Sequence, residues 1–296
     1  MSALVRAAQR RLGALLARIV PHAPPSATDD PPPSLEAPVS QGCTQVQFDT
    51  DIYRAWCAEI REAPRYHRKQ WEFCYILQVL AKAGKLAPGQ RGLGFGVGVE
   101  PLTAVFAARS CEVVATDLGT EEARRLGWID TQQHAAELAA LNDRGICPAE
   151  VFAAHASFRT VDMNAIPGDL DGFDFTWSAC SLEHLGSIRQ GLAFIENSLR
   201  PLRPGGIAVH TTEYNCSSNR LTLDHGSTVI FRRRDIAALA ERLRAAGHRI
   251  ELNFNLGEQP LDTHIDVAPY SADRHLKLRI AEYVTTSFGI SITKGA

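Results

Sequence analysis

The chain has 296 residues, enough for one large domain or two small ones, and 45% of them are hydrophobic. Its formal net charge of −2 excludes binding to nucleic acid through a bulk positive charge. The seven cysteines are scattered without a CxxC pair, which excludes a disulfide framework and a zinc pattern and favours a reducing, cytoplasmic compartment.

Residues 1–20 form a basic amphipathic leader with apolar side chains at helical spacing, four arginines and no acidic residue. Two interpretations stay open: peripheral contact with an anionic membrane surface or a partner, and a loosely ordered helical extension. Residues 21–45 are rich in proline and poor in apolar side chains, which predicts a linker that does not pack.

Residues 46–90 predict a helical cap or lid of two helices, and residues 91–296 then alternate apolar strands with helices. Such alternation is typical of a parallel sheet covered by helices on both faces. The last two strand patterns have no helix between them, so we expect them to pair antiparallel. The expected strands lie near 91–95, 112–117, 158–162, 173–178, 206–214, 248–256 and 278–294, and the expected helices of this part near 99–109, 120–141, 183–200 and 233–247.

A glycine-rich loop follows the first strand of this series. Gly94, Gly96 and Gly98 let the backbone turn tightly and approach a ligand without a Cβ in the way. Asp117 ends the next strand, where a carboxylate can accept hydrogen bonds from both hydroxyls of a ribose. The G-x-G-x-x-G spacing of dinucleotide folds is missing, and no Lys-Ser/Thr pair of a phosphate loop follows. The pattern therefore indicates a nucleoside-containing cofactor that is not a dinucleotide.

This combination resembles the class I S-adenosylmethionine-dependent methyltransferases, and later segments agree with them in order. The VDMN segment at 161–164 looks like the end of the family's third strand, where an acidic side chain accepts from the adenine amino group. The FDFTWSACSLEHL segment at 173–185 is similar to the fourth strand and the loop that faces the methyl group. The resemblance covers roughly residues 88–293 and implies a Rossmann-like, doubly wound seven-stranded sheet with an antiparallel last strand.

The resemblance implies S-adenosyl-L-methionine as the cofactor and S-adenosyl-L-homocysteine as the product. By position it assigns cofactor contacts to Gly94, Phe95, Gly96, Gly98, Glu100, Asp117, Leu118, Asp162, Met163 and Ser178.

The chain departs from the family pattern at Gly92, where members usually carry an acidic residue near the methionine ammonium group. The nearest acidic substitute is Glu100, in the first turn of the following helix. A carboxylate there also stabilises the helix itself by ~0.3–1 kcal/mol. Both roles of Glu100 stay open.

Methyl transfer is a direct displacement at a sulfonium carbon, and an alcohol acceptor must also lose its proton. His184 follows the fourth strand and is the candidate general base, because an imidazole titrates near neutrality. In many relatives a similar histidine only shapes the pocket, which is the alternative here. Glu183 is expected to be a first-turn helix residue, with a position facing the pocket as its alternative.

The acceptor is expected to contact the cap helix and two polar loops, at 215–230 and 257–275. The aromatic and basic start of the cap helix could form a lid, or could be a solvated face with its tryptophan in the core. The candidate acceptor-binding residues are Trp71, Tyr214, Asn215, Asp224, His225 and His264. Aspartates and histidines of both loops could hold a divalent metal, but nothing in the sequence fixes their geometry, and we predict no metal ligand.

We therefore expect a methyltransferase that O-methylates a small or medium-sized acceptor, either a sugar or glycan or a secondary metabolite. The absence of an Asn/Asp-Pro-Pro-Tyr/Phe motif argues against N-methylation of bases and glutamine amides. Two alternatives remain: a non-catalytic S-adenosylmethionine-binding scaffold or regulator, and a nicotinamide-dependent oxidoreductase, which the missing third glycine disfavours. The sequence predicts no oligomeric state.

Overall fold

The computed structural model describes residues 28–121 and 138–296, and a mixed sheet forms their centre. Five strands run parallel to their neighbours: β5 (Ala156–Thr160), β4 (Glu112–Asp117), β3 (Arg91–Phe95), β6 (Phe173–Ala179) and β7 (Leu202–Asn215). β12 (Tyr283–Thr293) pairs antiparallel with β7. The predicted parallel sheet with an antiparallel last strand is therefore confirmed.

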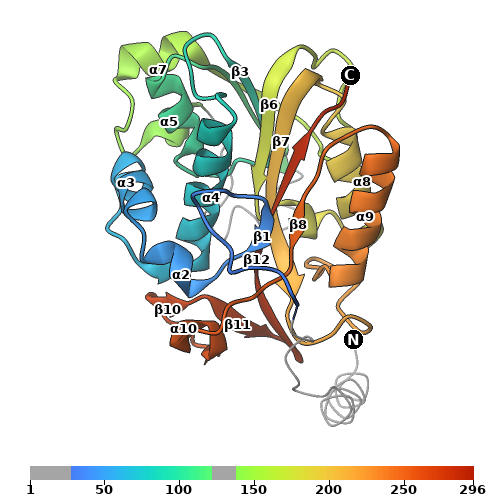
Figure 1. Ribbon diagram of the computed structural model, residues 1–296. Helices are drawn as coiled ribbons and strands as arrows, with labels where there is room; N and C mark the ends of the chain where they lie inside the picture. The colour runs from blue at the N-terminus through green and yellow to red at the C-terminus, as the bar shows by residue number, and fades with distance from the viewer. Residues whose placement is uncertain (1–27, 122–137) are drawn as a thin grey trace.

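Helices cover both faces of this sheet, so the predicted doubly wound α/β arrangement is also confirmed (Figure 1). One face carries α3 (Asp51–Glu59), α4 (Arg68–Lys82), α5 (Leu102–Ala108) and α7 (Ala149–His155), and the other carries α8 (Ile188–Asn197) and α9 (Arg233–Ala245). The segment expected to be a helical cap is thus part of a layer, because α4 lies along the sheet. Among the described residues, no helix has the length and apolar character needed to span a membrane.

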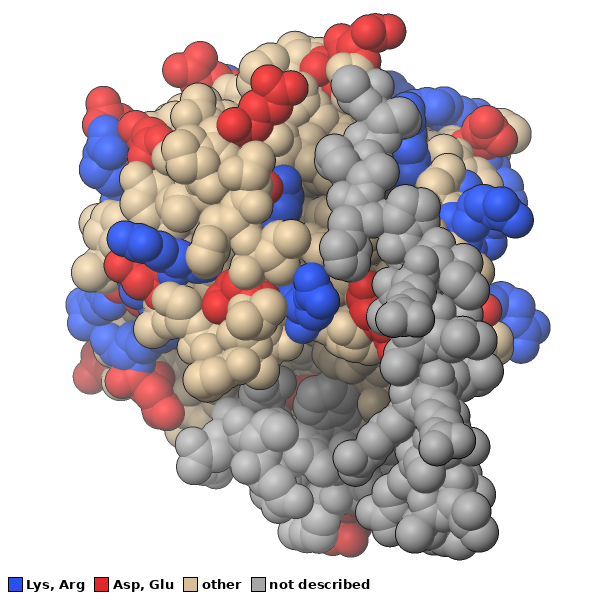
Figure 2. Space-filling view, turned by 90° about the horizontal axis from the view of Figure 1, so that it is seen from below, with Lys and Arg blue, Asp and Glu red and all other residues tan. Residues whose placement is uncertain are grey.

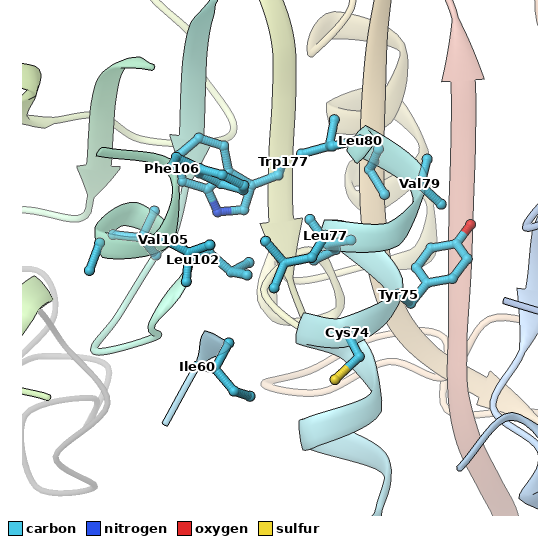
Figure 3. Close-up of a cluster of buried hydrophobic side chains, with 14 of the residues drawn as sticks. Ile60, Cys74, Tyr75, Leu77, Val79, Leu80, Leu102, Val105, Phe106 and Trp177 are labelled. Atoms are coloured by element: carbon cyan, nitrogen blue, oxygen red, sulfur yellow. The ribbon is translucent and has the colours of Figure 1, made fainter. Parts of the chain in front are cut away.

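The side chains of alternating strand residues contribute to two separate hydrophobic cores, one on each face of the sheet. On β7, Ile207 and Val209 join the core under α4 and α5, whereas Ala208 between them joins the core under α8 and α9. Figure 3 shows side chains of α4, including Leu77, gathered beside Trp177 and Phe106. The rings of Phe106 and Trp177 meet edge to face at 4.9 Å. The period of two along a strand is the physical reason that a single strand serves both layers.

Shorter elements gather at the edge of the sheet where the parallel strands end. They are α2 (Gln45–Phe48), β2 (Tyr66–His67), η2 (Leu182–His184), α10 (Pro260–Thr263), β9 (Ile265–Asp266), β10 (Arg274–His275) and β11 (Lys277–Ile280). The short helix η1 (Leu138–Asn142) instead lies beside α5 and β5. β10 pairs with β2, which ties the C-terminal excursion to the start of α4. In Figure 1 this excursion lies below the carboxyl ends of the parallel strands.

The segment before residue 45 differs from the expected linker as far as it is described. Residues 40–42 form strand β1, and Leu35 is fully buried in the core under α4. The Gln78 side chain donates to the Leu35 carbonyl at 2.7 Å. Proline-rich composition did not prevent packing, because a short extended segment satisfies its backbone groups on neighbouring strands.

The last two strand patterns do not pair along their length, contrary to expectation. β1 lies between β12 and β8 (Leu252–Asn253), antiparallel to β12 and parallel to β8. Only an isolated bridge between Arg249 and Thr293 joins the two segments directly. The expected seven-stranded sheet thereby becomes a larger one, with β1, β9 and β11 added.

Three predictions fall partly or wholly outside the described residues: the leader at 1–20, the first part of the linker at 21–45 and the helix near 120–141. Of that helix only its two ends are described. The helix expected over 183–200 is divided into η2 and α8, with Gly186 between them at φ 103°.

The burial of Leu35 predicts that the segment before β1 stabilises the domain. Leu35→Ala removes a fully buried side chain, so we expect it to lower the free energy of unfolding by ~2–5 kcal/mol. The matched control is Leu221→Ala, since that leucine is 45% exposed. Urea unfolding of both variants measures the difference. Equal stabilities would show that the segment behaves as a linker.

Candidate active site

The glycine loop between β3 and α5 has a geometry that only glycine allows. A Cβ on Gly94 would lie 2.3 Å from Cζ2 of Trp177, so the strand end touches the indole ring directly. Gly96 and Gly98 have φ angles of 56° and 49°, in the left-handed region. The loop therefore presents bare backbone at the carboxyl end of β3, the edge where ligands bind in open parallel sheets.

Asp117 lies beside this loop, as the sequence predicted. Its Oδ2 accepts from the Gly98 N–H at 3.0 Å, and its Oδ1 accepts from the Leu118 N–H at 2.8 Å. The carboxylate is partly exposed at the end of β4. The Asp117 carboxylate is therefore hydrogen bonded directly to the glycine loop.

Met163 and Ser181, which follow strands β5 and β6, both contact the glycine loop. The Met163 sulfur lies 3.1 Å from the place where a Cβ on Gly96 would stand. The Ser181 hydroxyl donates to the Gly96 carbonyl at 2.9 Å. Asp162, next to Met163, is exposed and accepts from the Asn164 N–H at 2.8 Å. The structure thus brings the ends of β3, β4, β5 and β6 together around the glycines.

Two of the predicted cofactor residues have their side chains elsewhere. The Phe95 ring is fully buried and packs edge to face on Phe194 of α8 at 5.3 Å. The Ser178 hydroxyl is fully buried and hydrogen bonds to Nδ1 of His210 at 2.8 Å. Both side chains belong to the core under α8, so only their backbones can line the site.

The acidic group that relatives carry at position 92 is replaced here by Glu100, and the Phe175 ring is the reason that position 92 is a glycine. A Cβ on Gly92 would lie 2.3 Å from the Phe175 ring, which leaves no room for an acidic side chain. Glu100 is 7% exposed, and its Oε1 accepts from Nε1 of Trp177 at 2.5 Å. Burial raises the pKa of the Glu100 carboxyl well above 4.5, and the charge of Asp117 adds to the rise.

A buried ionic network lies at the ends of β6 and β7, under the first turn of α4. Arg68 forms an ion pair with Glu213, and its Nη1 lies 3.5 Å from Oε1 of Glu72. Burial opposes ionisation of Glu213, but Arg68 outweighs it and holds the pKa of that carboxyl below its usual value. Lys69, whose side chain is 42% exposed, places Nζ 3.7 Å from Glu72 and connects the network to the surface.

Glu72 is the most completely satisfied carboxylate of this network. It accepts from the hydroxyls of Thr211 at 2.9 Å and Ser287 at 2.5 Å, and from the thiol of Cys180 at 3.2 Å. Glu213 similarly accepts from the Thr285 hydroxyl at 3.0 Å. The network therefore joins α4 to β6, β7 and β12 at the carboxyl edge of the sheet.

Glu183 is the third buried carboxyl group at this edge. It is 1% exposed, and burial raises the pKa of its carboxyl. Ligand-capable atoms of Cys180, Glu183 and Glu213 all lie within 4.8 Å of one another. Cys180 has a φ of 50°, a left-handed conformation that is strained for a non-glycine residue and is often found at functional sites.

The structure separates most of the predicted acceptor residues from this edge. Trp71 is fully buried against Tyr75, and Tyr214 packs on Phe288 on the other face of β7. Asn215 is buried and uses its side chain to hold the following turn. Asp224 and His225 form an exposed pair with each other, and His264 is exposed. Tyr214 is a core residue because the alternation along β7 points it away from Glu213, and Trp71 lies on the side of α4 that faces the core.

His184 does follow β6, as predicted, and its Nδ1 lies 2.7 Å from the Ser227 carbonyl, to which it can donate. This nitrogen therefore contacts the loop at 215–230. The aspartates of the loop at 257–275, which were only possible metal ligands, have other partners. The carboxylate of Asp266 contacts His275, and that of Asp262 contacts backbone N–H groups. In the described ranges, the grouping with metal-ligand character is Cys180, Glu183 and Glu213, and Arg68 within it competes with a cation.

The residues that the sequence interpretation missed are Glu72, Cys180, Thr211, Glu213 and Ser287. A usable signal exists for the carboxylates, because Arg68 and Glu72 have the i,i+4 spacing of a helical ion pair. Glu213 stands in the interior of a strand, on the same face as Thr211 two residues earlier. A charged residue inside a buried strand indicates a buried partner.

Comparisons with known proteins give similar folds at low identity. No protein-family model matches the chain, and no curated protein matches it. Magnesium protoporphyrin IX methyltransferase from Synechocystis PCC 6803 with bound S-adenosylhomocysteine is 13% identical, over 83% of this chain and 94% of that chain, with a TM-score of 0.45. The N-methyltransferase NodS from Bradyrhizobium japonicum is 16% identical, over 74% of this chain and 94% of that chain, with a TM-score of 0.42.

A third similar structure is a Haemonchus contortus phosphoethanolamine N-methyltransferase in complex with phosphomonomethylethanolamine and S-adenosylhomocysteine. It is 18% identical, over 64% of this chain and 40% of that chain, with a TM-score of 0.41. The chain thus spans less than half the length of this protein. At these identities and TM-scores, the assignment of function rests on the residues of the chain itself.

The buried carboxyl group of Glu100 predicts a pH-dependent difference in stability. Because its pKa is raised on folding, the folded state holds a proton that the unfolded state has lost above pH 4.5, so this contribution to stability falls as pH rises. Glu100→Gln keeps an acceptor for Trp177 and does not titrate. We expect the variant to gain stability relative to the wild type between about pH 5 and about pH 8, measured by urea unfolding. A difference that does not change with pH would contradict the assignment.

Proposed function

We propose that the chain is an S-adenosylmethionine-dependent methyltransferase that O-methylates a small or medium-sized acceptor. The observation that carries the proposal is the contact of Asp117 with the glycine loop at the carboxyl edge of a sheet with an antiparallel last strand. An S-adenosyl nucleoside needs a carboxylate for its ribose and bare backbone for its amino-acid part. Asp117 supplies the carboxylate, the glycine loop supplies the bare backbone, and a hydrogen bond joins the two.

The remaining parts of the cofactor have counterparts around the same loop. Asp162 is exposed and lies beside the buried Met163. The Asp162 carboxylate can accept a hydrogen bond from the adenine amino group, and Met163 can cover the adenine ring. Glu100 lies behind the glycines, where its carboxylate can balance the methionine ammonium group. Burial raises the pKa of the Glu100 carboxyl, and a cation bound beside it would stabilise the ionised form.

The loop disfavours a nicotinamide dinucleotide for a steric reason. The third glycine of that fingerprint allows a helix to pack closely on the first strand. Here Val99 stands at one of the two possible positions and is 45% exposed, and Pro101 stands at the other, just before α5.

The acceptor is proposed to approach the ionic network at the ends of β6 and β7. The carboxylates, hydroxyls and guanidinium of this network can orient a polar molecule, and a carboxylate can receive a proton from a hydroxyl group. Figure 2 shows the molecule from this end, and Lys and Arg side chains lie beside Asp and Glu side chains over the described part of the face. A face of mixed charge suits a small polar acceptor better than a polyanion.

Asp117→Asn tests the cofactor assignment. The variant keeps an oxygen for the Gly98 N–H but loses the charge and one acceptor for the ribose diol. We expect the affinity for S-adenosylhomocysteine to fall by ~1.5–3 kcal/mol, or about tenfold to a hundredfold in Kd, by calorimetric titration. Asp169→Asn is the matched control, because that aspartate is exposed and pairs only with Arg159 in the described structure. Equal affinities for the two variants, or wild-type binding of NADH instead, would refute the assignment.

Transfer of a tritiated methyl group from S-adenosylmethionine to small-molecule extracts tests the enzymatic part. We expect label in a neutral or polar small molecule, bound through an ether that survives mild base, whereas a methyl ester does not. Tight cofactor binding with no labelled product from any extract would indicate the non-catalytic scaffold instead. Label attached to nitrogen would overturn O-methylation and retain the methyltransferase.

A further inference from the structure

The turn after β6 is fixed to both sides of the proposed methyl-transfer site. Ser181 contacts the Gly96 carbonyl of the glycine loop at 2.9 Å. The Cys180 N–H donates to the Thr211 hydroxyl at 3.0 Å and to the Thr211 carbonyl at 3.1 Å on β7. Because Glu183 follows within this turn, its backbone is held between the cofactor loop and the end of β7.

Glu183 has the weakest compensation of the three buried carboxyl groups. Glu72 has three close donors, and Glu213 has Arg68 and a threonine hydroxyl. Glu183 accepts from the Thr212 hydroxyl at 3.3 Å and lies beside the thiol of Cys180, a weak donor. A buried carboxyl group with so few donors holds its proton more tightly than an exposed one, and the pKa of Glu183 is raised by its burial.

A second observation points to a ligand at the same place. Arg68 is 5% exposed, and its Nε–H has no hydrogen-bond partner among the described residues. The other nitrogens of this guanidinium contact Ser287, Cys180 and Glu213. An unpaired buried donor costs free energy unless an acceptor atom reaches it. An oxygen of a bound acceptor molecule would satisfy it, whereas a metal ion would not.

We propose that Glu183 faces the transferring methyl group and takes the proton of a hydroxyl-bearing acceptor. This inference rests on the proposed function. An oxygen lone pair of the acceptor forms the new O–CH3 bond, the S–CH3 bond breaks, and its electron pair stays on sulfur to give S-adenosylhomocysteine. The hydroxyl proton passes to the Glu183 carboxylate, so charges and atoms balance without a further reactant.

The neighbouring titratable groups are less suited to this step. Glu72 and Glu213 are committed to Arg68 and to hydroxyl donors, and the Cys180 thiol holds its proton because burial raises its pKa. His184 places Nδ1 at the Ser227 carbonyl, which orients its ring toward the loop at 215–230. Lys69, the remaining charged group of the cluster, carries a positive charge beside Glu72 and helps Glu183 to ionise when the site is used.

The test uses sinefungin, an analogue of S-adenosylmethionine in which an amino-bearing carbon replaces the methyl-bearing sulfur. Its ammonium group reports which side chains face the methyl position, and no acceptor needs to be known. We expect Glu183→Gln to weaken sinefungin binding at least about tenfold and to leave S-adenosylhomocysteine binding within about twofold. Glu196→Gln, a half-exposed carboxylate of α8 paired with Arg242, is the matched control and should change neither.

A second readout separates ionisation from structure. When the ammonium group of sinefungin binds, a protonated Glu183 should ionise and release a proton, which calorimetry in two buffers of different ionisation enthalpy detects. Glu183→Gln should abolish this release, and Glu183→Asp, which keeps the charge, should restore part of it. Intact S-adenosylhomocysteine binding with unchanged sinefungin affinity and unchanged proton release in Glu183→Gln would overturn the inference alone. Absence of S-adenosylhomocysteine binding in the wild type would instead overturn the proposed function.

Discussion

The ion pair between Arg68 and Glu213 fixes the first turn of α4 against the carboxyl edge of the sheet. A buried pair of this kind is costly to form and costly to break, since loss of one partner leaves an uncompensated charge worth about 3–5 kcal/mol. The surrounding hydroxyls follow from this constraint, because Thr211 and Ser287 add donors to Glu72 and Thr285 adds one to Glu213. The polar residues of β7 and β12 are therefore requirements of the network and not interruptions of an apolar core.

The same constraint places chemistry beside the glycine loop. α4 would cover the strand ends with apolar side chains if its first turn resembled the rest of the helix, and the site would close. Instead the helix begins with charged residues that need partners at the ends of β6 and β7. The result is a polar cluster on one side and bare backbone on the other, an arrangement that suits the proposed reaction between a sulfonium and a hydroxyl.

The parts of the site that could be predicted from the sequence are those encoded locally. The glycines at 94, 96 and 98 and Asp117 lie in one strand–loop–helix–strand unit, and their roles follow from backbone geometry alone. The ionic network could not be predicted in the same way, because it joins segments near 70, 180, 212 and 286 that no short-range pattern relates. Tyr214 shows the opposite error: it is adjacent to Glu213 in the chain but faces the other core, so proximity in sequence misled the interpretation.

The departure at Gly92 has a packing cause that the sequence did not reveal. Phe175, on the neighbouring strand β6, fills the space where a side chain at 92 would stand. The acidic group is found instead at Glu100, anchored to Trp177 two residues further along β6. Two aromatic residues on one strand thus exclude the carboxylate from β3 and hold it at the start of the next helix.

Strand β1 links the two ends of the chain in a way that concerns the order of assembly. Its three residues are synthesised early, yet they hydrogen bond to β12 and β8, as in the contact between Ser40 and Ser291 that spans 251 positions. Contacts of such sequence separation form slowly, since a long loop must close first. The nascent chain must therefore keep this segment unpaired until β8 and β12 have left the ribosome, so that edge of the sheet is completed late in folding.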